Sequence, residues 1–312
     1  MRKILGVDLD ADVEPMFAQA TPGRILVLDG DFAAYKAAAT AKTLPVVYRR
    51  FIQDVLTDLF LTQSEYAIVH VTASASRKAH RALYPTFWPY QDNRKDKKKP
   101  PLLEPLRHFL SEDPPGLPEN VEVILHHHWE ADDGIIMDGE HHLHNCIVKS
   151  GDKDLRMTRA PYWEEKTGRI DVITDRFGWI DEAFTDGGAR KVIGHGTAFF
   201  WAQMLMGDTA DRVRGLDKLD GKQVGAAGAL EFLAPFRDES ECANAVLWEY
   251  AKSKQNALAE AEMMWLRRNP EDSAFAYLME LELDDSLRHW LQATHEWHLK
   301  VLAQKLEETD DE

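Results

Sequence analysis

Acidic side chains gather where the sequence predicts that a strand ends and a helix begins. The apolar run 121–125 is typical of a buried strand, and the segment from Ile135 is typical of a helix. Between them lie the carboxylates of Glu130, Asp132 and Asp133. Because like charges this close repel and are costly to desolvate, the cluster favours a hard divalent cation such as Mg²⁺. The alternative is a plain helix start, whose dipole also attracts acids.

Two more carboxylate groups follow predicted strands. Asp29 comes directly after the apolar run 24–28, and Asp152 and Asp154 come after the short run 145–148. In open α/β sheets, sites form at the carboxyl ends of parallel strands. Each group has an ordinary alternative, a helix N-cap for Asp29 and an Asx turn for the pair. Acids at three strand ends favour one shared site over three independent turns.

A further acidic pair precedes a loop rich in glycine. The helix predicted from Thr197 stops near residue 207, and Asp208 and Asp211 are spaced to share one face of a turn. The loop then leads into a helix predicted at 226–233. Two helices joined in this way can offer backbone N–H groups to a phosphate. The loop residues that we expect to contact nucleic acid are Gly215, Gly221, Lys222 and Gly225.

One strongly basic segment, at about residues 77–110, interrupts an acidic chain. Its cations alternate with aromatic rings, among them Phe87, Trp88 and Tyr90, and this combination suits a strand of nucleic acid. A solvated basic loop is the alternative, but it explains only the lysines. The candidate contacts are Arg77, Lys78, Arg81, Arg94, Lys95, Lys97 and Lys98.

The elements that must position these groups follow a strand–helix–strand order. Runs at 24–28, 46–61 and 66–71 predict a parallel α/β sheet with crossover helices. Residues 162–174 predict a hairpin, and residues 239–309 predict two or three long helices. We expect the aromatic and sulfur side chains of these helices to be core residues, namely Trp248, Met263, Met264, Trp265, Trp290 and Trp297.

The expected organisation is a leader at 1–22, a nuclease-like α/β core at 23–190 and a helical region at 191–312 with a disordered acidic tail. The 312 residues carry a net charge of −16, which by itself counts against nucleic-acid binding, although the charge is unevenly distributed. Two cysteines argue against a disulfide scaffold, and no apolar run reaches the ~18 residues of a membrane span. We therefore expect a cytoplasmic protein without membrane contact, and a monomer.

Five short motifs occur in a recognisable order. They are Asp29-Gly30, Tyr90-Gln91-Asp92-Asn93-Arg94, Glu130-Ala131-Asp132-Asp133, Ser150-Gly151-Asp152-Lys153-Asp154-Leu155 and Gly207-Asp208-Thr209-Ala210-Asp211. Over residues 24–236 their order resembles the 5′ nuclease (flap endonuclease) superfamily, especially bacteriophage 5′→3′ exonucleases. The resemblance implies a PIN-like parallel sheet, a helical arch over the site, and a helix–three-turn–helix at about 197–236 that holds duplex DNA.

The resemblance also implies roles for individual residues. Asp29, Glu130 and Asp132 match ligands of a first Mg²⁺ or Mn²⁺ ion; the remaining matching carboxylates are Asp133, Asp152, Asp154, Asp208 and Asp211. Arg94 and nearby lysines match residues that grip phosphate, and the loop 215–225 matches a turn that often binds K⁺. In the implied reaction, two ions about 3.5–4 Å apart cleave DNA to 5′-phosphate and 3′-hydroxyl ends.

The implied substrate is DNA with a 5′ end or flap, and an RNA–DNA hybrid is a further candidate; the setting would be phage DNA replication or degradation. Two positions depart from the family pattern, because Thr72 stands where an aspartate is usual and Gln91 where a lysine is usual. Our hypothesis is that Asp31 partly replaces the missing carboxylate. Two rivals remain: a branched-DNA-binding protein with weakened catalysis, and a metal phosphohydrolase that uses His126–His128 with Asp132 and Asp133.

Overall fold

The computed structural model describes residues 3–4, 7–8, 19–94, 97–112 and 114–310 of the chain. Its centre is a six-stranded sheet with the strand order β5-β4-β3-β6-β7-β8. The strands are β3 (Thr21–Asp29), β4 (Ser64–Thr72), β5 (Val121–His126), β6 (Cys146–Lys149), β7 (Tyr162–Glu164) and β8 (Arg169–Asp171). All neighbours run parallel except β7 and β8, which form the predicted hairpin. The predicted α/β class is confirmed.

The register brings the strand ends to one edge. Asp29 is aligned with His70 on β4, and Thr72 at the end of β4 is aligned with His126 on β5. On the other side, Leu28 is aligned with Lys149 on β6. The residues that follow these strands therefore emerge together at the carboxyl edge of the sheet, where parallel sheets place their sites.

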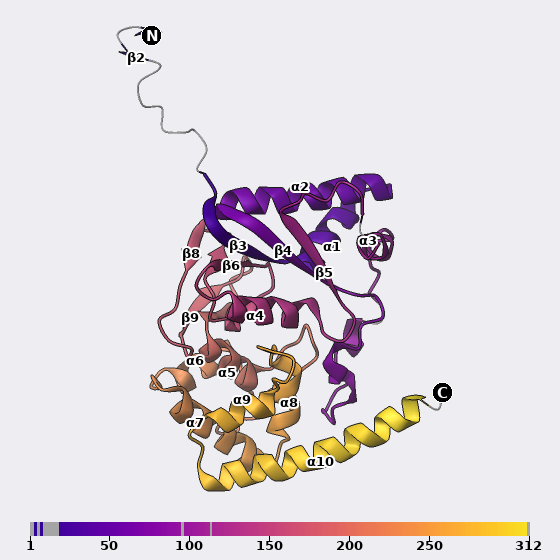
Figure 1. Ribbon diagram of the computed structural model, residues 1–312. Coiled ribbons are helices and arrows are strands. Elements are labelled where there is room, and N and C mark those ends of the chain that lie inside the picture. Colours follow the sequence, from indigo (N-terminus) through magenta and orange to yellow (C-terminus); the bar gives the residue numbers. More distant parts are fainter. Residues whose placement is uncertain (1–2, 5–6, 9–18, 95–96, 113, 311–312) are drawn as a thin grey trace.

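The two faces of the sheet support two hydrophobic cores. Leu26 and Leu28 pack with α1 (Gly30–Thr40), α2 (Leu44–Thr62) and α3 (Leu103–Leu110), and Val27 packs on the opposite face with α4 (Ala131–His141). This alternation follows from the two-residue period of a strand. Figure 1 shows α1 and α2 on one side of the sheet and α4 on the other.

The core on the α4 side continues into the second half of the chain. It includes α5 (Thr197–Met206), α6 (Ala226–Leu233), α7 (Glu239–Ser253), α8 (Ala257–Met264) and α9 (Ala274–Glu280), and it ends on the first turns of α10 (Asp285–Asp310). In Figure 1 these helices lie beyond α4, with α10 along the edge of the molecule. α5 and α6 confirm the two helices predicted on either side of the glycine-rich loop.

Several expectations for the second half were wrong. Residues 239–310 form four helices rather than two or three, and the acidic stretch is helical as far as Asp310. Trp248 and Trp297 are 39% and 48% exposed, so they are not core residues. A hairpin of β9 (Trp179–Phe184) and β10 (Arg190–His195) was not expected, because neither strand shows a clear alternation of apolar and polar residues.

At the N-terminus, residues 3–4 and 7–8 form a short pair, β1 and β2, and β3 already begins at Thr21 inside the expected leader. Residues 1–2, 5–6 and 9–18 of that leader lie outside the described residues. The basic segment joins β4 to β5 through two 3₁₀ turns, at Lys78–Leu83 and Asp92–Arg94, before reaching α3. Helix α3 packs on α1 and α2, so it belongs to the core and not to a cover over the site. Among the described helices, none is both long and apolar enough to cross a membrane.

Candidate metal centre and nucleic-acid interface

Asp29 sits at the end of β3, where the sheet ends and α1 begins. It caps that helix, because its Oδ1 accepts a hydrogen bond of 2.9 Å from the Phe32 N–H. Its Oδ2 accepts one of 2.6 Å from the hydroxyl of Ser150, which follows β6. Burial raises the pKa of Asp29 to about 6, and the charges of Asp31 and Asp152 add to the shift. The N-cap alternative is therefore correct, and it coexists with a buried acidic site.

The N-terminus of α4 carries the central acids. Glu130 is the N-cap residue, and it forms a capping box with Asp133. For Asp132, between them, burial and then the nearby charges of Asp152 and Asp29 raise the pKa well above its usual value. The residues after β3, β5 and β6 thus share one electrostatic environment, as the pattern of strand-end acids predicts.

Arg81 is buried against this helix, which corrects its expected role as a contact to nucleic acid. Its side chain is 2% exposed and donates to both oxygens of Asp133, at 2.8 and 2.6 Å. It also donates to Glu130 at 2.9 Å and to the carbonyl of Trp265 at 2.9 Å. Because it is buried and already paired with two carboxylates, this guanidinium presents no exposed face to a phosphate.

The expectation that Asp133 is a metal ligand is also corrected. It is fully buried, and besides Arg81 it accepts backbone N–H bonds from Glu130 and Arg267, each at 3.1 Å. Burial by itself would raise the pKa of Asp133, but the Arg81 guanidinium holds that pKa below its usual value. Both oxygens are therefore committed to the protein, and Asp133 acts as the anchor for Arg81.

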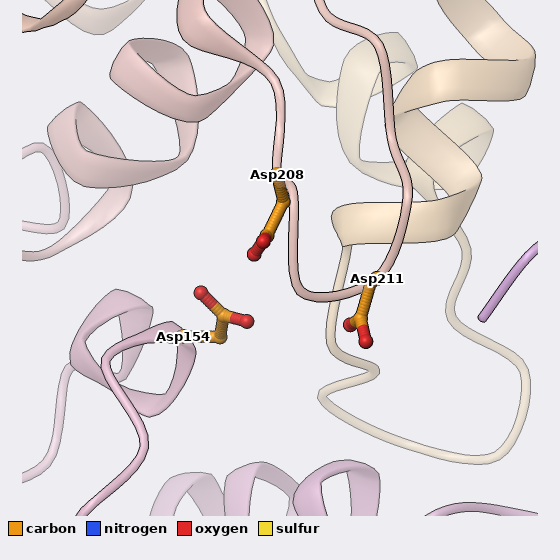
Figure 2. Close-up of side chains that lie close together, drawn as sticks. All are labelled: Asp154, Asp208 and Asp211. Carbon is orange, nitrogen blue, oxygen red and sulfur yellow. The ribbon is translucent and has the colours of Figure 1, made fainter. Parts of the chain in front are cut away.

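Asp154, Asp208 and Asp211 form a compact acidic triplet. Each can offer one oxygen such that the three atoms lie within 4.8 Å of one another, and no other such group of three occurs among the residues that the structure describes. Figure 2 shows Asp154 on its 3₁₀ turn facing Asp208, with Asp211 farther along the loop after α5. Burial and the charge of Asp152 raise the pKa of Asp154 to about 7. A hard divalent cation would relieve this repulsion.

The motif around Tyr90 connects the two acidic groups. The Tyr90 hydroxyl contacts Glu130 at 2.8 Å and Asp211 at 3.4 Å, and the Gln91 amide nitrogen contacts the same two carboxylates at 3.3 and 3.0 Å. The Gln91 N–H also donates to the backbone carbonyl of Asp211. The acids after the strands and the triplet therefore line one continuous site, although they are up to 182 positions apart in the chain.

Thr72 stands where the resemblance implies an aspartate, and its hydrogen bonds connect α1, β4 and α4. Its hydroxyl accepts the Ala131 N–H at 2.8 Å, which helps to start α4. Its own N–H donates to Asp31 Oδ1 at 3.2 Å, and Arg107 of α3 donates to the same oxygen at 2.7 Å. The Asp31 carboxylate thus lies beside residue 72, as the replacement hypothesis requires.

The remaining basic residues lie on or near the surface. Arg94 pairs with Asp211 and donates to the carbonyl of Ala210 at 3.1 Å, so it stands at the triplet. Lys78 lies 3.2 Å from Glu130 and is 40% exposed. Exposed cations that can face a phosphate are Arg77, Lys97 and Lys98, whereas Lys95 lies outside the described residues.

The glycine-rich loop differs from expectation at Gly215. This residue is buried, its N–H donates to Glu260 at 3.3 Å, and a Cβ placed on it would meet the Gly207 nitrogen at 2.2 Å. Gly215 is therefore needed for packing, and the expectation that it contacts nucleic acid is corrected. Gly221, Lys222 and Gly225 are exposed, and Gly225 precedes the first residue of α6.

The histidine-based rival finds no support. His126 forms a 2.8 Å hydrogen bond with His70, which in turn lies 3.1 Å from Asp138. Burial and the neighbouring His70 lower the pKa of His126 to about 4. Within the described part of the chain, no histidine belongs to a group of three that could hold an ion.

Sequence reasoning missed several residues that shape the site. Lys153 was visible between two aspartates but was not singled out, and it contacts both Asp154 and Asp208. Arg107 and the backbone of Trp265 and Arg267 carry no local signal, because they reach the site only through tertiary packing.

Comparison with known proteins supports the fold. No protein-family model and no curated protein matches the chain. Among solved structures, a bacteriophage T5 flap endonuclease in a pseudo-enzyme–product complex with DNA and metal ions is 13% identical, with a TM-score of 0.52, covering 90% of this chain and 99% of that one. A zinc-bound T5 5′-exonuclease is 16% identical, with a TM-score of 0.47, over 90% of this chain and 96% of that one. The chain therefore shares its fold with the T5 flap endonuclease.

Proposed function

We propose that this protein is a divalent-metal-dependent 5′ nuclease that hydrolyses DNA phosphodiesters near a 5′ end or flap. The observation that carries the proposal is the convergence of acids from three strand ends and one distant loop into a single site, bordered by cations. The fold it shares with a T5 flap endonuclease agrees with this function. A non-catalytic protein would gain nothing from buried acids facing DNA, because they repel phosphate.

The side chains fit a hard cation. All candidate ligands are carboxylates, which Mg²⁺ and Mn²⁺ prefer, and no cysteine or histidine is among them. Asp29, Glu130 and Asp132 would hold one ion, and Asp154, Asp208 and Asp211 would hold a second, with Asp152 between the two groups. When bound, such ions supply an activated water and stabilise the departing oxygen.

The protein's own residues would position the substrate. Arg94 stands beside Asp211 at the edge of the site and can meet the phosphate next to the scissile bond. Lys78, half exposed beside Glu130, offers a second cation to the same phosphate. The exposed Gly221–Gly225 turn would hold the duplex through backbone N–H groups, and we propose K⁺ as an additional ion there.

The test uses a duplex labelled at its 5′ end and a matching 5′-flap substrate. We expect short labelled products only when Mg²⁺ or Mn²⁺ is present, with cleavage abolished by EDTA and by Asp208→Asn. The matched control Asp186→Asn alters an exposed aspartate between β9 and β10 and should cleave normally. Binding of the flap without any cleavage in either metal would favour the weakened DNA-binding protein instead. The ratio of flap to duplex-end cleavage, and a hybrid substrate, would define the preferred substrate.

A further inference from the structure

Lys153 places an ammonium group inside the acidic triplet. Its Nζ lies 2.6 Å from Asp154 Oδ1 and 2.5 Å from Asp208 Oδ2. These carboxylates belong to segments more than fifty residues apart in the chain, so the lysine joins the 3₁₀ turn after β6 to the loop after α5. The contact is therefore part of the site and not a local pairing on one helix.

The backbone around Lys153 is held in place, whereas half of its side chain is open to solvent. The N–H of Asp154 donates to Asp152 Oδ1 at 3.0 Å, and the N–H of Asp152 donates to Ser150 Oγ at 2.8 Å. In contrast, the Lys153 side chain is 50% exposed, whereas that of Asp208 is 3% exposed. Rotation about the flexible lysine stem can thus move the ammonium into solvent while the carboxylates stay where they are.

An ammonium and a divalent cation cannot use these oxygens together. The lysine donates to one oxygen of each aspartate, and these are the two triplet carboxylates that face each other in Figure 2. A cation bound between them would stand within a few ångströms of the ammonium, where two positive charges repel strongly in a partly buried site. Binding of one therefore disfavours binding of the other.

We propose that Lys153 is a built-in competitor for the cation at Asp154, Asp208 and Asp211, so that it sets how tightly this cluster binds a divalent ion. This inference rests on the proposed function, because it takes the triplet to be a metal site. Without a divalent ion, the lysine neutralises the triplet and keeps the two segments together. With the ion bound, the ammonium turns outward toward solvent, where a DNA phosphate can receive it.

The test is a calorimetric titration of the DNA-free protein with Mn²⁺, which needs no turnover. Lys153→Met keeps the apolar stem but removes the charge, and it should tighten binding at the cluster by roughly three- to tenfold, as expected for the loss of a partly exposed ion pair. Lys153→Arg keeps the charge and should stay near the wild-type affinity. Lys166→Met is the matched control, because it removes one positive charge at the exposed tip of the β7–β8 hairpin.

Asp208→Asn identifies which binding event belongs to the cluster. If that event is present but Lys153→Met binds Mn²⁺ no more tightly than Lys166→Met, the competition is refuted and the metal site stands. If Asp208→Asn loses no binding event, the triplet does not bind the ion, and the proposed function fails with it.

Thermal unfolding gives a second readout should Lys153→Met prove unstable. In EDTA this variant should melt below Lys166→Met, because Asp154 and Asp208 lose the counter-ion that they share. Added Mn²⁺ should then raise its melting temperature more than it raises that of the wild type. An equal rise in both proteins would overturn the proposal.

Discussion

At the level of single residues, Thr72 and Asp31 are linked by a hydrogen bond at the edge of the site. Thr72 cannot bind a metal as a carboxylate does. Its N–H donates a hydrogen bond to Asp31, and its hydroxyl accepts one from the Ala131 N–H at the start of α4. We propose that the Asp31 carboxylate, on α1, supplies the charge that is missing at residue 72. Arg107 neutralises part of that charge, so Asp31 is held at a fixed position on the rim of the site.

We predict that Asp31→Ala weakens Mg²⁺-dependent cleavage by roughly 10- to 100-fold, the range seen when supporting groups of metal sites are lost. Adding Thr72→Asp in the same protein should restore most of the activity, because the new carboxylate lies where Asp31 points and can still accept the Ala131 N–H. Steady-state cleavage over a Mg²⁺ series measures both effects. Unchanged activity and Mg²⁺ dependence in Asp31→Ala would contradict the hypothesis.

His298 of α10, which lies away from the site, should make the stability of the folded protein depend on pH. It is 1% exposed, lies 2.9 Å from the Asn256 amide nitrogen, and packs edge-on against Tyr84. Burial and the neighbouring His295 lower the pKa of His298 from 6.5 to about 4. The folded protein therefore resists a proton that the unfolded chain accepts, and its stability is lost as the pH falls from about 6.5 toward about 4.

We predict that His298→Gln removes part of this loss. Between about pH 7 and about pH 5, the wild type should lose roughly 2 kcal/mol more unfolding free energy than the variant. Urea denaturation at both pH values measures the difference, and His289→Gln, at an exposed position of the same helix, is the control. Parallel losses in wild type and His298→Gln would show that this histidine titrates normally.

At the level of elements, one buried arginine ties three segments together. Arg81 fastens the basic segment to the first turn of α4 and to the carbonyl of Trp265, after α8. Without Arg81, the buried carboxylates of Glu130 and Asp133 at the N-terminus of α4 would lack a buried compensating positive charge. This clamp explains why Glu130 keeps its orientation although it lies beside a loop.

We predict that Arg81→Met destabilises the protein by about 3–5 kcal/mol, because it leaves buried Glu130 and Asp133 without their partner. Arg77→Met, four residues earlier and exposed, should cost little. Denaturant unfolding of both variants without metal gives the comparison. A small cost for Arg81→Met would mean that water or another cation replaces the guanidinium.

Two glycines of the loop between α5 and α6 make a matched pair. Gly215 and Gly221 have φ angles of +71° and +78°, but a Cβ on Gly215 would meet the Gly207 backbone, whereas one on Gly221 would meet nothing within 4 Å. Both alanine variants lose about 1–2 kcal/mol to the left-handed backbone. Gly215→Ala should lose clearly more, and its loop should also bind a flap substrate less tightly. Equal melting temperatures in the two variants would contradict the packing role.

At the level of the whole molecule, a net charge of −16 coexists with one basic segment. Acidic side chains line the proposed site, while Lys97 and Lys98 stand exposed beyond the Tyr90 motif. Binding of DNA should therefore depend on a few local cations and fall steeply with salt, despite the unfavourable overall charge.

We predict that Lys97→Ala with Lys98→Ala lowers the steepness of that salt dependence. Each lost phosphate contact reduces the slope of log K against log salt by about 0.7–0.9. The control removes Lys252 and Lys254 near the end of α7 and should leave the slope unchanged. Binding measured with Ca²⁺ at several salt concentrations decides the outcome, and an unaltered slope in the first variant would place the phosphate contacts elsewhere.

Some features were readable from the sequence because they depend on neighbours in the chain. The strands β3 to β6, the crossover helices, the β7–β8 hairpin and the acids at strand ends all follow from short-range periodicity and turn chemistry. The order of five motifs then indicated the fold. In parallel sheets all strand ends meet at one edge, so local patterns sufficed to predict that Asp29, Asp132 and Asp152 lie near one another.

Tertiary structure alone decided how each charge is used. Arg81 and Lys153 look alike in sequence, each a cation beside a motif, yet one is buried as a clamp and the other stands half exposed in the acidic triplet. Likewise, Asp133 and Asp132 are adjacent, but only Asp133 meets a guanidinium and a backbone N–H from 134 residues away. Burial and pairing depend on contacts between distant segments, and these have no signature in local sequence.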